Sequence, residues 1–410
     1  MAANPANSRP SSPRNILAFG ITSFFNDTAT EMAYWVLPAF LVSLGAGPAQ
    51  LGLIEGLAES VASFAKLFSG YLTDRLDRRK PLVVAGYFVA NAVKPVLAIT
   101  TAWWQILLIR FTDRLAKGVR GAPRDVMVAE SVEKERLGSA YGLIQSFDSA
   151  GAIAGPLIAL LLLGRLGARW GIAGNVRGVF WAAAVPGALA VLVALFGVRE
   201  TRGPDHQSEH AHTREQLLTA AQPRVSLPGS FYFVLFAVAL FSLGNSSDMF
   251  LVMRAQNAGI RVALAPLLGL VFNLTYTFGS WPAGWCSDQF SRRGFSRRWL
   301  AVAGYLIFGG VYFVFGRVPS TFAIWIAMAV YGLYYALTQP VLKALVVETV
   351  SQEVRGRALG IYFFSTSVTT LAASLITGEL WKVYGAGTPF YLSAGLATVA
   401  AGVLALSSLF

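Results

Sequence analysis

The sequence has 410 residues, of which 55% are apolar and only 13% are charged, and its formal net charge is +12. This composition excludes a soluble globular protein and indicates an integral membrane protein. The single cysteine, Cys286, excludes an intramolecular disulfide. Nucleic acid is excluded as a partner, because the chain offers no soluble basic face and membrane topology accounts for its positive charge.

Apolar segments of roughly 20 residues, long enough to cross about 30 Å of hydrocarbon as a helix, recur along nearly the whole chain. We expect about twelve transmembrane helices, in chain order 16–44, 51–73, 81–100, 103–126, 139–163, 178–198, 230–253, 263–287, 299–316, 321–347, 358–380 and 388–409. A polar stretch from Arg199 to Gly229 contains three prolines and is typical of a linker. The predicted domains are a tail at 1–14, a six-helix bundle at 15–198, a linker at 199–229 and a second six-helix bundle at 230–410.

Most lysines and arginines lie in the N-terminal tail and in the loops that follow even-numbered spans. This asymmetry predicts that the tail and those loops face the cytoplasm, and with twelve spans the C-terminus does so too. The first apolar segment is too long for the core of a signal peptide and shows no small-residue cleavage site, so we expect the N-terminus to be retained.

The two halves of the chain repeat one pattern, an acid followed by methionine on a helix rich in Phe, Ser and Thr. It spans Phe24 to Met32 and recurs about 217 positions later from Phe241 to Met249. Short matches elsewhere, such as Leu51-Gly52-Leu53 with Leu268-Gly269-Leu270, fall at the same offset. Parallel repeats of this kind place a substrate site between the halves near the membrane midplane, so the duplication predicts a transporter.

After the second span the chain reads Gly70-Tyr71-Leu72-Thr73-Asp74-Arg75-Leu76-Asp77-Arg78-Arg79-Lys80, and a degenerate copy runs from Gly284 to Asp288. Glycine allows helices to approach closely, and an acid beside bases can form a latch that breaks when the halves move. The order resembles motif A of the major facilitator superfamily, which implies an all-α membrane fold of twelve helices in two pseudo-symmetric six-helix bundles. An ordinary basic loop is the alternative. The predicted gate residues are Gly70, Asp74, Arg75, Arg78, Arg79 and Asp288.

In the fourth span Arg110, Asp113, Arg114 and Lys117 are spaced to share one helix face. A charge at the centre of a membrane helix costs roughly 2.5–3.5 kcal/mol, so this face should meet water, substrate or opposite charges. The segment is similar to motif B of proton-coupled members, which implies that Arg114 influences proton release from a nearby acid. A purely structural charge network is the alternative.

The fifth span contains Gly142, Gly151 and Gly155-Pro156. This spacing resembles motif C of antiporters, in which it bends the fifth helix against the eighth. The closing glycine pair is replaced by Ala159-Leu160, and small-residue packing is the alternative. Segments 25–32 and 113–125 also resemble a bacterial branch of the superfamily, whose members are mostly uncharacterised or assigned as exporters. That branch implies a multi-pass protein of the bacterial inner (plasma) membrane.

All three histidines lie in the linker, so proton coupling should depend on carboxylates. Low dielectric raises the pKa of a carboxyl group in general, and a nearby cation lowers it. The first candidates are Asp27 and Glu31, one helical turn apart; Asp248, which aligns with Glu31, and Asp148 follow. A satisfied salt bridge within the membrane is the alternative for each.

The remaining charged candidates leave the charge of the substrate open. Glu55 and Glu59 share a face with Lys66 near the outer end of the second span, where a solvated gate pair and a coupling pair are both possible. The bases of the expected cavity could bind a carboxylate-bearing solute or neutralise its acids. Those bases are Lys94, Arg110, Arg114, Lys117 and Lys343, and the acids are Asp27, Glu31, Asp113 and Asp248.

A metal site is not expected. His206, His210 and His212 are spaced like metal ligands, but a short polar linker is the more ordinary interpretation. The spans offer one cysteine and no histidine, which disfavours a bare transition metal ion as the substrate. Aromatic residues such as Tyr331 and Tyr335 could line a pocket, although packing is their default role.

We therefore expect a proton-coupled antiporter that exports a small organic compound by rocker-switch alternating access. The alternatives are a proton symporter that imports an organic acid or a metal chelate, and a receptor or scaffold that transports nothing. No catalytic triad, metal-ligand cluster or phosphate loop indicates an enzyme. The expected partners are the solute, protons and the bilayer; the proton gradient replaces any cofactor, and we expect a monomer.

Overall fold

The computed structural model describes residues 13–75, 78–132, 136–166, 171–201, 227–293, 296–317, 320–350 and 355–406. Within these ranges every regular element is a helix. The first half contains α1 (Pro13–Tyr34), α2 (Leu37–Ser43), α3 (Pro48–Arg75), α4 (Lys80–Ala92), the 3₁₀ helix η2 (Pro95–Ile99), α5 (Trp103–Glu130), α6 (Leu137–Leu166) and α7 (Gly171–Gly197).

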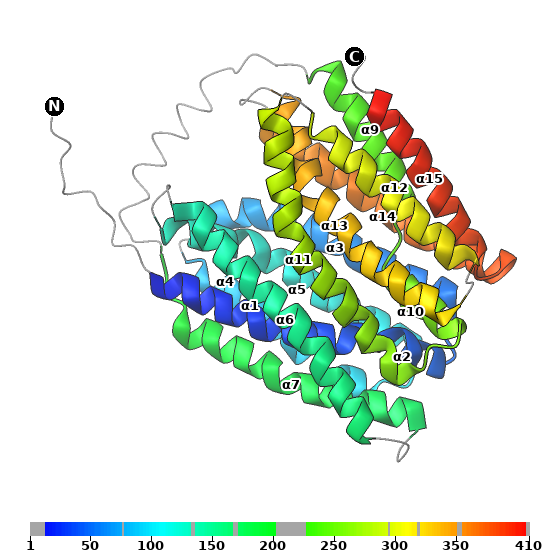
Figure 1. Cartoon of the computed structure of the whole chain (residues 1–410). Helices are drawn as coiled ribbons and strands as arrows, with labels where there is room; N and C mark the ends of the chain where they lie inside the picture. The colour runs from blue at the N-terminus through cyan, green and yellow to red at the C-terminus, as the bar shows by residue number, and fades with distance from the viewer. Residues whose placement is uncertain are drawn as a thin grey trace.

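The second half contains α9 (Gly229–Gly244), α10 (Met249–Asn257), η5 (Val262–Leu264), α11 (Ala265–Arg292), α12 (Arg298–Arg317), α13 (Thr321–Glu348), α14 (Arg355–Tyr384) and α15 (Thr388–Leu406). In the described part of the chain these elements form twelve spans, because α1 with α2 and α9 with α10 each make one broken span. The predicted all-α membrane fold of two six-helix bundles is confirmed, and Figure 1 shows the two bundles.

The first span of each repeat is broken once: the break begins one helical turn after the repeated acid in the first half and includes the acid in the second. The first break follows Tyr34, and Pro38, which lacks an N–H donor, lies in the first turn of α2. The second separates Gly244 from Met249. The repeated acids Glu31 and Asp248 therefore lie beside the two interruptions, where broken membrane helices commonly form binding sites.

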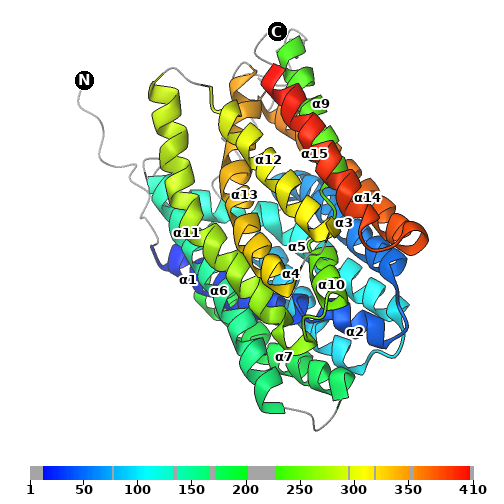
Figure 2. The ribbon, with the colours of Figure 1, turned by 45° about the vertical axis from the view of Figure 1, so that its right-hand side comes forward.

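The bundles meet at one end of the molecule. The first half of α3 packs on α14: the Ser60 hydroxyl lies 3.3 Å from the Ser367 carbonyl oxygen, and a Cβ added at Gly52 would collide with the carbonyl oxygen of Ser374. At the same end α2 contacts α10, and the two lie side by side in both ribbon views (Figures 1 and 2). The structure is thus closed at the end where α3 begins.

Hydropathy differs between the halves. Nine of the described segments are long and apolar enough to cross a membrane, and they include all six spans of the second half. In the first half only segments 80–99, 139–165 and 174–197 qualify. The other three helices, α1, α3 and α5, fall short because charged and other polar side chains lower their hydropathy. The functional candidates concentrate on these three helices.

Candidate functional site

A charged cavity of about 270 Å³ lies inside the first bundle. Its wall is built from α1, α3, α4, α5 and α6. Five cationic and four acidic side chains line it, together with small and polar residues: Ser23, Asn26, Asp27, Glu59, Ala62, Ser63, Lys66, Tyr87, Arg114, Lys117, Gly118, Arg120, Gly121, Arg124, Asp125 and Asp148.

The charged face predicted on α5 points to the interior of the bundle. Arg110, Asp113 and Arg114 are buried, while Lys117 is exposed and lines the cavity. Gly118 lets α5 approach α3, because a Cβ there would collide with the carbonyl oxygen of Ala62. Arg120 continues the same face and also lines the cavity. Sequence reasoning missed Arg120, although its position three residues after Lys117 is the helical signal that could have found it.

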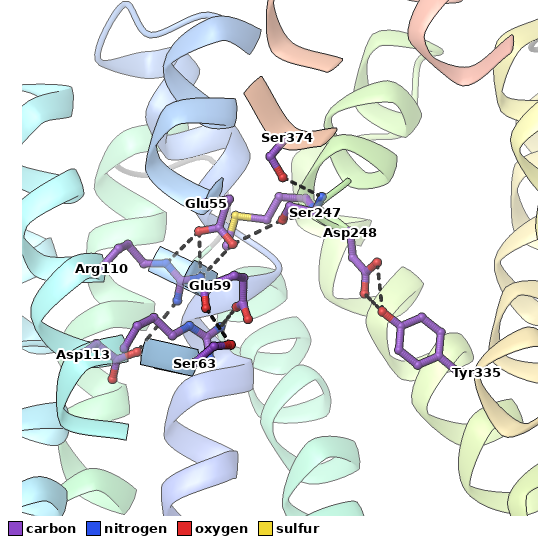
Figure 3. Close-up of polar contacts among 11 residues, drawn as sticks. Glu55, Glu59, Ser63, Arg110, Asp113, Ser247, Asp248, Tyr335 and Ser374 are labelled. Atoms are coloured by element: carbon purple, nitrogen blue, oxygen red, sulfur yellow. Dashed lines mark hydrogen bonds and ion pairs between the residues drawn. The ribbon is translucent and has the colours of Figure 1, made fainter. Parts of the chain in front are cut away.

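Glu55 and Arg110 form the most buried ion pair on this face (Figure 3). The Arg110 Nε and Nη2 atoms each donate at 2.8 Å to one Glu55 carboxylate oxygen, and the Glu55 side chain is only 1% exposed. The Asp113 carboxylate lies 3.9 Å from Arg110 Nη1. The suggested solvated gate pair is therefore wrong for Glu55, because α3 turns this acid inward onto a guanidinium.

Glu59 has different surroundings. Its carboxylate lies 3.2 Å from Arg114 Nη2 and is 45% exposed, so it faces the cavity while it pairs. Further along α3, Lys66 Nζ lies 4.0 Å from Asp125 Oδ2. The other oxygen of the same carboxylate, Oδ1, lies 3.1 Å from Arg124 Nη2. The acids and bases of α3 and α5 thus form successive pairs along the two helices.

Asp27 lies at the centre of the polar interior. The Asn26 amide donates to Asp27 Oδ1 at 2.9 Å, Asn91 donates to Asn26 Oδ1 at 3.1 Å, and Lys94 Nζ donates to Asn91 Oδ1 at 2.8 Å. Lys94 is 4% exposed and lies near Arg110 and Asp113 beside a small void of about 20 Å³. Two side-chain amides therefore connect a cavity acid with a buried amine. Sequence reasoning missed Asn91, which carries no charge to mark it.

A second cavity of about 140 Å³ lies between the bundles, where α1 and α6 face α11. Its lining includes Gln145, Ser149, Asn273, Tyr276 and Thr277. Of the lining residues that the structure describes, it shares only Asp27 and Asp148 with the larger cavity. In the described part of the chain one carboxylate oxygen of Asp148, Oδ1, has no hydrogen-bond partner. Two carboxyl groups thus stand on the boundary between the intrabundle and interbundle cavities.

Glu31 lies one helical turn after Asp27 and interacts with it electrostatically, but it lies deeper among the helices. Its Oε2 atom accepts a hydrogen bond of 2.7 Å from Trp35 Nε1, and it lines neither of these two cavities. A Cβ added at Gly155 would press on the Glu31 side chain. The structure therefore brings Asp27 together with Asp148 in the cavity walls and leaves Glu31 where α1, α6 and Asn273 of α11 meet.

The glycines of α6 pack differently from the expectation of a fifth helix bent against the eighth. A Cβ at Gly151 would collide with the Phe24 carbonyl oxygen, so Gly151, like Gly155, faces the first helix. The eighth span, α11, reaches α6 through Asn273, whose amide donates to the Ala152 carbonyl oxygen at 2.8 Å. A Cβ added at Gly142 would meet no atom of another described element within 4 Å, and Pro156 lies buried inside α6.

Asp248 faces α13 across the second bundle. Its carboxylate accepts hydrogen bonds from the Tyr331 hydroxyl at 2.7 Å and from the Tyr335 hydroxyl at 3.2 Å. Figure 3 shows Tyr335 on one side of Asp248 and the Glu55 group on the other. The interior around it is aromatic, with ring contacts among Phe241, Phe272, Tyr276, Tyr305, Phe308, Tyr312, Tyr331, Tyr334 and Tyr335.

Ser247, next to Asp248, joins the bundles. Its hydroxyl donates to Glu55 Oε2 at 3.2 Å, and its backbone N–H donates to the Ser374 hydroxyl at 3.3 Å (Figure 3). The break between α9 and α10 therefore contacts the buried ion pair of the other bundle.

Among the predicted gate residues whose side chains the structure describes, Arg79 forms an ion pair. It is buried and pairs with Glu130, whose other oxygen accepts a 2.8 Å hydrogen bond from Thr201. This contact stays within the first bundle. Arg78 is exposed, and a Cβ added at Gly70 would meet no atom of another described element within 4 Å. The predictions for the Asp74, Arg75, Asp288 and Lys343 side chains, and for His206, His210 and His212, fall outside the described residues.

No group of three or more His, Cys, Asp or Glu side chains in the described ranges could hold a metal ion. The site consists instead of ionisable side chains around two cavities that have space for water and a small solute. Twelve spans in two bundles, with this charged interior, define the class of membrane transporter built from two repeated halves.

The sequence model of the Major Facilitator Superfamily matches residues 19–294 and 234–409, and the chain belongs to this superfamily. An uncharacterised MFS-type transporter of Methanocaldococcus jannaschii is 31% identical over 376 residues, which cover 90% of this chain and 89% of that protein. Multidrug resistance protein MdtG of Escherichia coli is 27% identical over 220 residues, about half of each chain (52% and 51%). The predicted superfamily membership is confirmed.

Solved structures agree in fold. A D-xylose-proton symporter superposes with a TM-score of 0.74 at 16% identity over 96% of both chains, and a POT family transporter with 0.78 at 11% identity over 97% of this chain and 96% of that one. At these identities the likeness establishes the shared architecture alone.

Proposed function

We propose that this chain is a proton-coupled secondary transporter that moves a small organic solute by alternating access. The observation that carries the proposal is the position of Asp27 and Asp148, which among the described residues are the two that line both the cavity inside the first bundle and the cavity between the bundles. Acids at such a boundary can exchange protons with water while a solute occupies the adjoining space. Because the chain has no membrane histidine, these carboxyl groups are the natural carriers.

In this proposal the protein lies in a bacterial inner membrane with both termini in the cytoplasm. The closed end formed by α2, α10 and the start of α3 then faces outward, so the structure corresponds to the inward-facing state. Rocking of the two bundles would separate α3 from α14 and open the outer side. The charges of α3 and α5 would travel as one unit with the first bundle.

Export by exchange for protons is the first candidate for direction. It is supported by the likeness of about half of the chain to a multidrug resistance protein. In this cycle Asp27 and Asp148 release protons to the cytoplasm when the solute binds, and they take up protons from the outer side after its release.

Co-transport of an organic acid with protons is the second candidate, and the charge balance of the larger cavity favours it. Its five cations exceed its four acids. Protonation of Asp27 and Asp148 would remove two of the negative charges, so an anionic solute and protons would stabilise each other in the cavity.

Proteoliposomes that contain a pH-sensitive dye test both candidates. When a solute is added outside, exchange makes the lumen more alkaline, whereas co-transport makes it more acidic. The variant that combines Asp27→Asn with Asp148→Asn should abolish either signal, and Glu379→Gln, at an exposed surface pair, is the control. If the double variant moves protons with solute as fast as the wild type, these acids are not the carriers and the proposal fails.

A further inference from the structure

We propose that the larger cavity binds an oxyanion group of the transported solute, a carboxylate or a phosphate, with Lys117 and Arg120 as its main partners. This inference rests on the proposed function and names the class of solute. It follows from which charges in the cavity already have partners and which do not.

Several cavity charges compensate one another. Arg114 pairs with Glu59, and Arg124 pairs with Asp125, which is also the closest acid to Lys66. One carboxylate therefore serves two cations. Glu59 and Asp125, the described acids of α3 and α5 that line the cavity, are engaged in these ion pairs. Neither of them pairs directly with the remaining cations of α5.

Lys117 and Arg120 are the cations without such a partner. Among the described residues neither has a carboxylate within ion-pair distance, although both line the cavity. Lys117 is exposed to the cavity, so its ammonium group can reach a solute without rearrangement of the helix. These two cations are therefore the ones that interact with the nearby acids only at longer range, and each keeps donors that no ion pair occupies.

Arg120 is held in place by an aromatic ring. Its guanidinium carbon lies 4.2 Å from the centre of the Tyr87 ring, and the residue is 6% exposed. Its Nη1 atom has no hydrogen-bond acceptor in the described part of the chain. A buried guanidinium that stacks on a ring and has no direct ion pair is oriented, and it keeps a donor that needs an acceptor. A planar oxyanion is the partner that fits its donors.

The acids Asp27 and Asp148 line the same cavity and have no cation within ion-pair distance among the described residues. When they carry protons, as the proposed function requires at one stage, they no longer compete for Lys117 and Arg120. The volume of about 270 Å³ suits a small organic molecule. The cavity therefore has space for a small solute and oriented hydrogen-bond donors. Protonation of Asp27 and Asp148 would leave those donors available to the solute.

Binding of four matched aromatic compounds to the purified full-length protein in detergent tests this inference. Benzoate and phenyl phosphate are anions with different oxyanion groups, whereas benzylamine is a cation and benzyl alcohol is neutral. Isothermal titration should show saturable binding of at least one anion and none of the amine or the alcohol. Comparison of benzoate with phenyl phosphate distinguishes a carboxylate site from a phosphate site.

Two variants locate the site. Lys117→Gln, at an exposed position, and Arg120→Gln should each weaken binding of the anion at least about 10-fold, the scale of one charged hydrogen bond. Lys382→Gln, whose ion pair with Glu379 is exposed on α14, should bind as the wild type does. The inference is overturned if the amine or the alcohol binds as tightly as the anions, if neither anion binds, or if both variants keep wild-type affinity.

The two proposals can fail separately. If neutral or cationic solutes drive proton movement in proteoliposomes and anions do not, the anion site is wrong and the proposed function stands. If anions bind through Lys117 and Arg120 but no solute moves protons, the site stands and proton-coupled transport is wrong.

Discussion

The two halves of this protein share one architecture and differ in what fills it. Every span of the second half is apolar enough to cross a membrane, whereas α1, α3 and α5 of the first half are not. The first half is held together by ion pairs such as Glu55–Arg110, and the second by stacked rings such as Phe241 on Tyr305, with centroids 3.9 Å apart. A duplicated fold has therefore been divided into a charged half and an aromatic half.

Because of this difference, the two halves should depend to different degrees on single polar atoms. A buried ion pair needs both partners, because the one left behind is an uncompensated charge. Stacked rings keep most of their contact area when one polar atom is lost. We therefore expect the first half to be sensitive to conservative substitutions and the second half to tolerate them.

The largest effect is expected at Glu55. Replacement by Met removes the bidentate partner of buried Arg110 and leaves it the weaker pair with Asp113 at 3.9 Å, so it should lower the free energy of unfolding by about 3 kcal/mol. Denaturant titration of the wild type and the variant in detergent measures this difference in unfolding free energy. The double variant Glu55→Met with Arg110→Met should recover most of the loss because no charge is stranded. An equal loss in the double variant would mean that packing, rather than charge, determines stability there.

The next effect concerns transport. The variant Asp27→Asn with Asp148→Asn should slow proton-coupled flux at least about 100-fold, the scale of removing a proton-transfer group. Asp248→Asn should keep most of the rate, because its carboxylate is held by two tyrosine hydroxyls and an amide oxygen still accepts from them. Fluorescence of a pH dye in proteoliposomes measures both. Equal loss in Asp248→Asn would extend proton coupling to the aromatic half and remove the distinction.

A smaller effect is expected where the halves meet. Gly52→Ala places a methyl group against the Ser374 carbonyl oxygen and should disfavour the closed contact by about 1–3 kcal/mol. The test uses a protein in which Cys286→Ser removes the native thiol and Ser367→Cys introduces one at the contact between α3 and α14. An impermeant thiol reagent should label this cysteine faster in the Gly52→Ala variant, because the contact opens more often. Gly142→Ala is the matched control, because its added methyl group would meet no atom of another described element within 4 Å. Unchanged labelling would show that this contact does not keep the end closed.

The smallest effect is expected inside the aromatic half. Tyr331→Phe removes a hydroxyl donor to Asp248 and should cost about 1 kcal/mol of unfolding free energy. Tyr305→Phe should cost close to nothing, because its buried hydroxyl has no partner among the described residues and its ring stack on Phe241 is retained. Thermal unfolding of the two variants in detergent compares them. A larger loss in Tyr305→Phe would reveal a polar network in this half.

The fold could be predicted because its signals are long and repeated. Apolar segments of membrane length and the recurrence of the segment 24–32 at 241–249 indicate twelve spans in two bundles without knowledge of any contact. The shared face of Arg110, Asp113 and Arg114 is also a property of one helix. Such periodic features depend only on the local geometry of the chain.

Partner choice between helices could not be predicted in this way. That Glu55 is buried while Glu59 faces the cavity depends on how α3 is rotated about its axis against α5. The approach of Asp148 to Asp27 depends on Gly151, which lets α6 lie against the backbone of α1. The members of the aromatic cluster come from four separate spans, so no local sequence pattern connects them. Each one taken alone is typical of an ordinary packing residue.

The order of synthesis gives the polar helices α3 and α5 a consequence for biogenesis. The ribosome makes α3 first, so Glu55 and Glu59 reach the translocon before Arg110 and Arg114 exist. Each lone charge at the centre of a membrane helix costs roughly 2.5–3.5 kcal/mol. The first half must therefore settle in the bilayer as a group once its bases have emerged, whereas the helices of the second half can enter lipid one at a time.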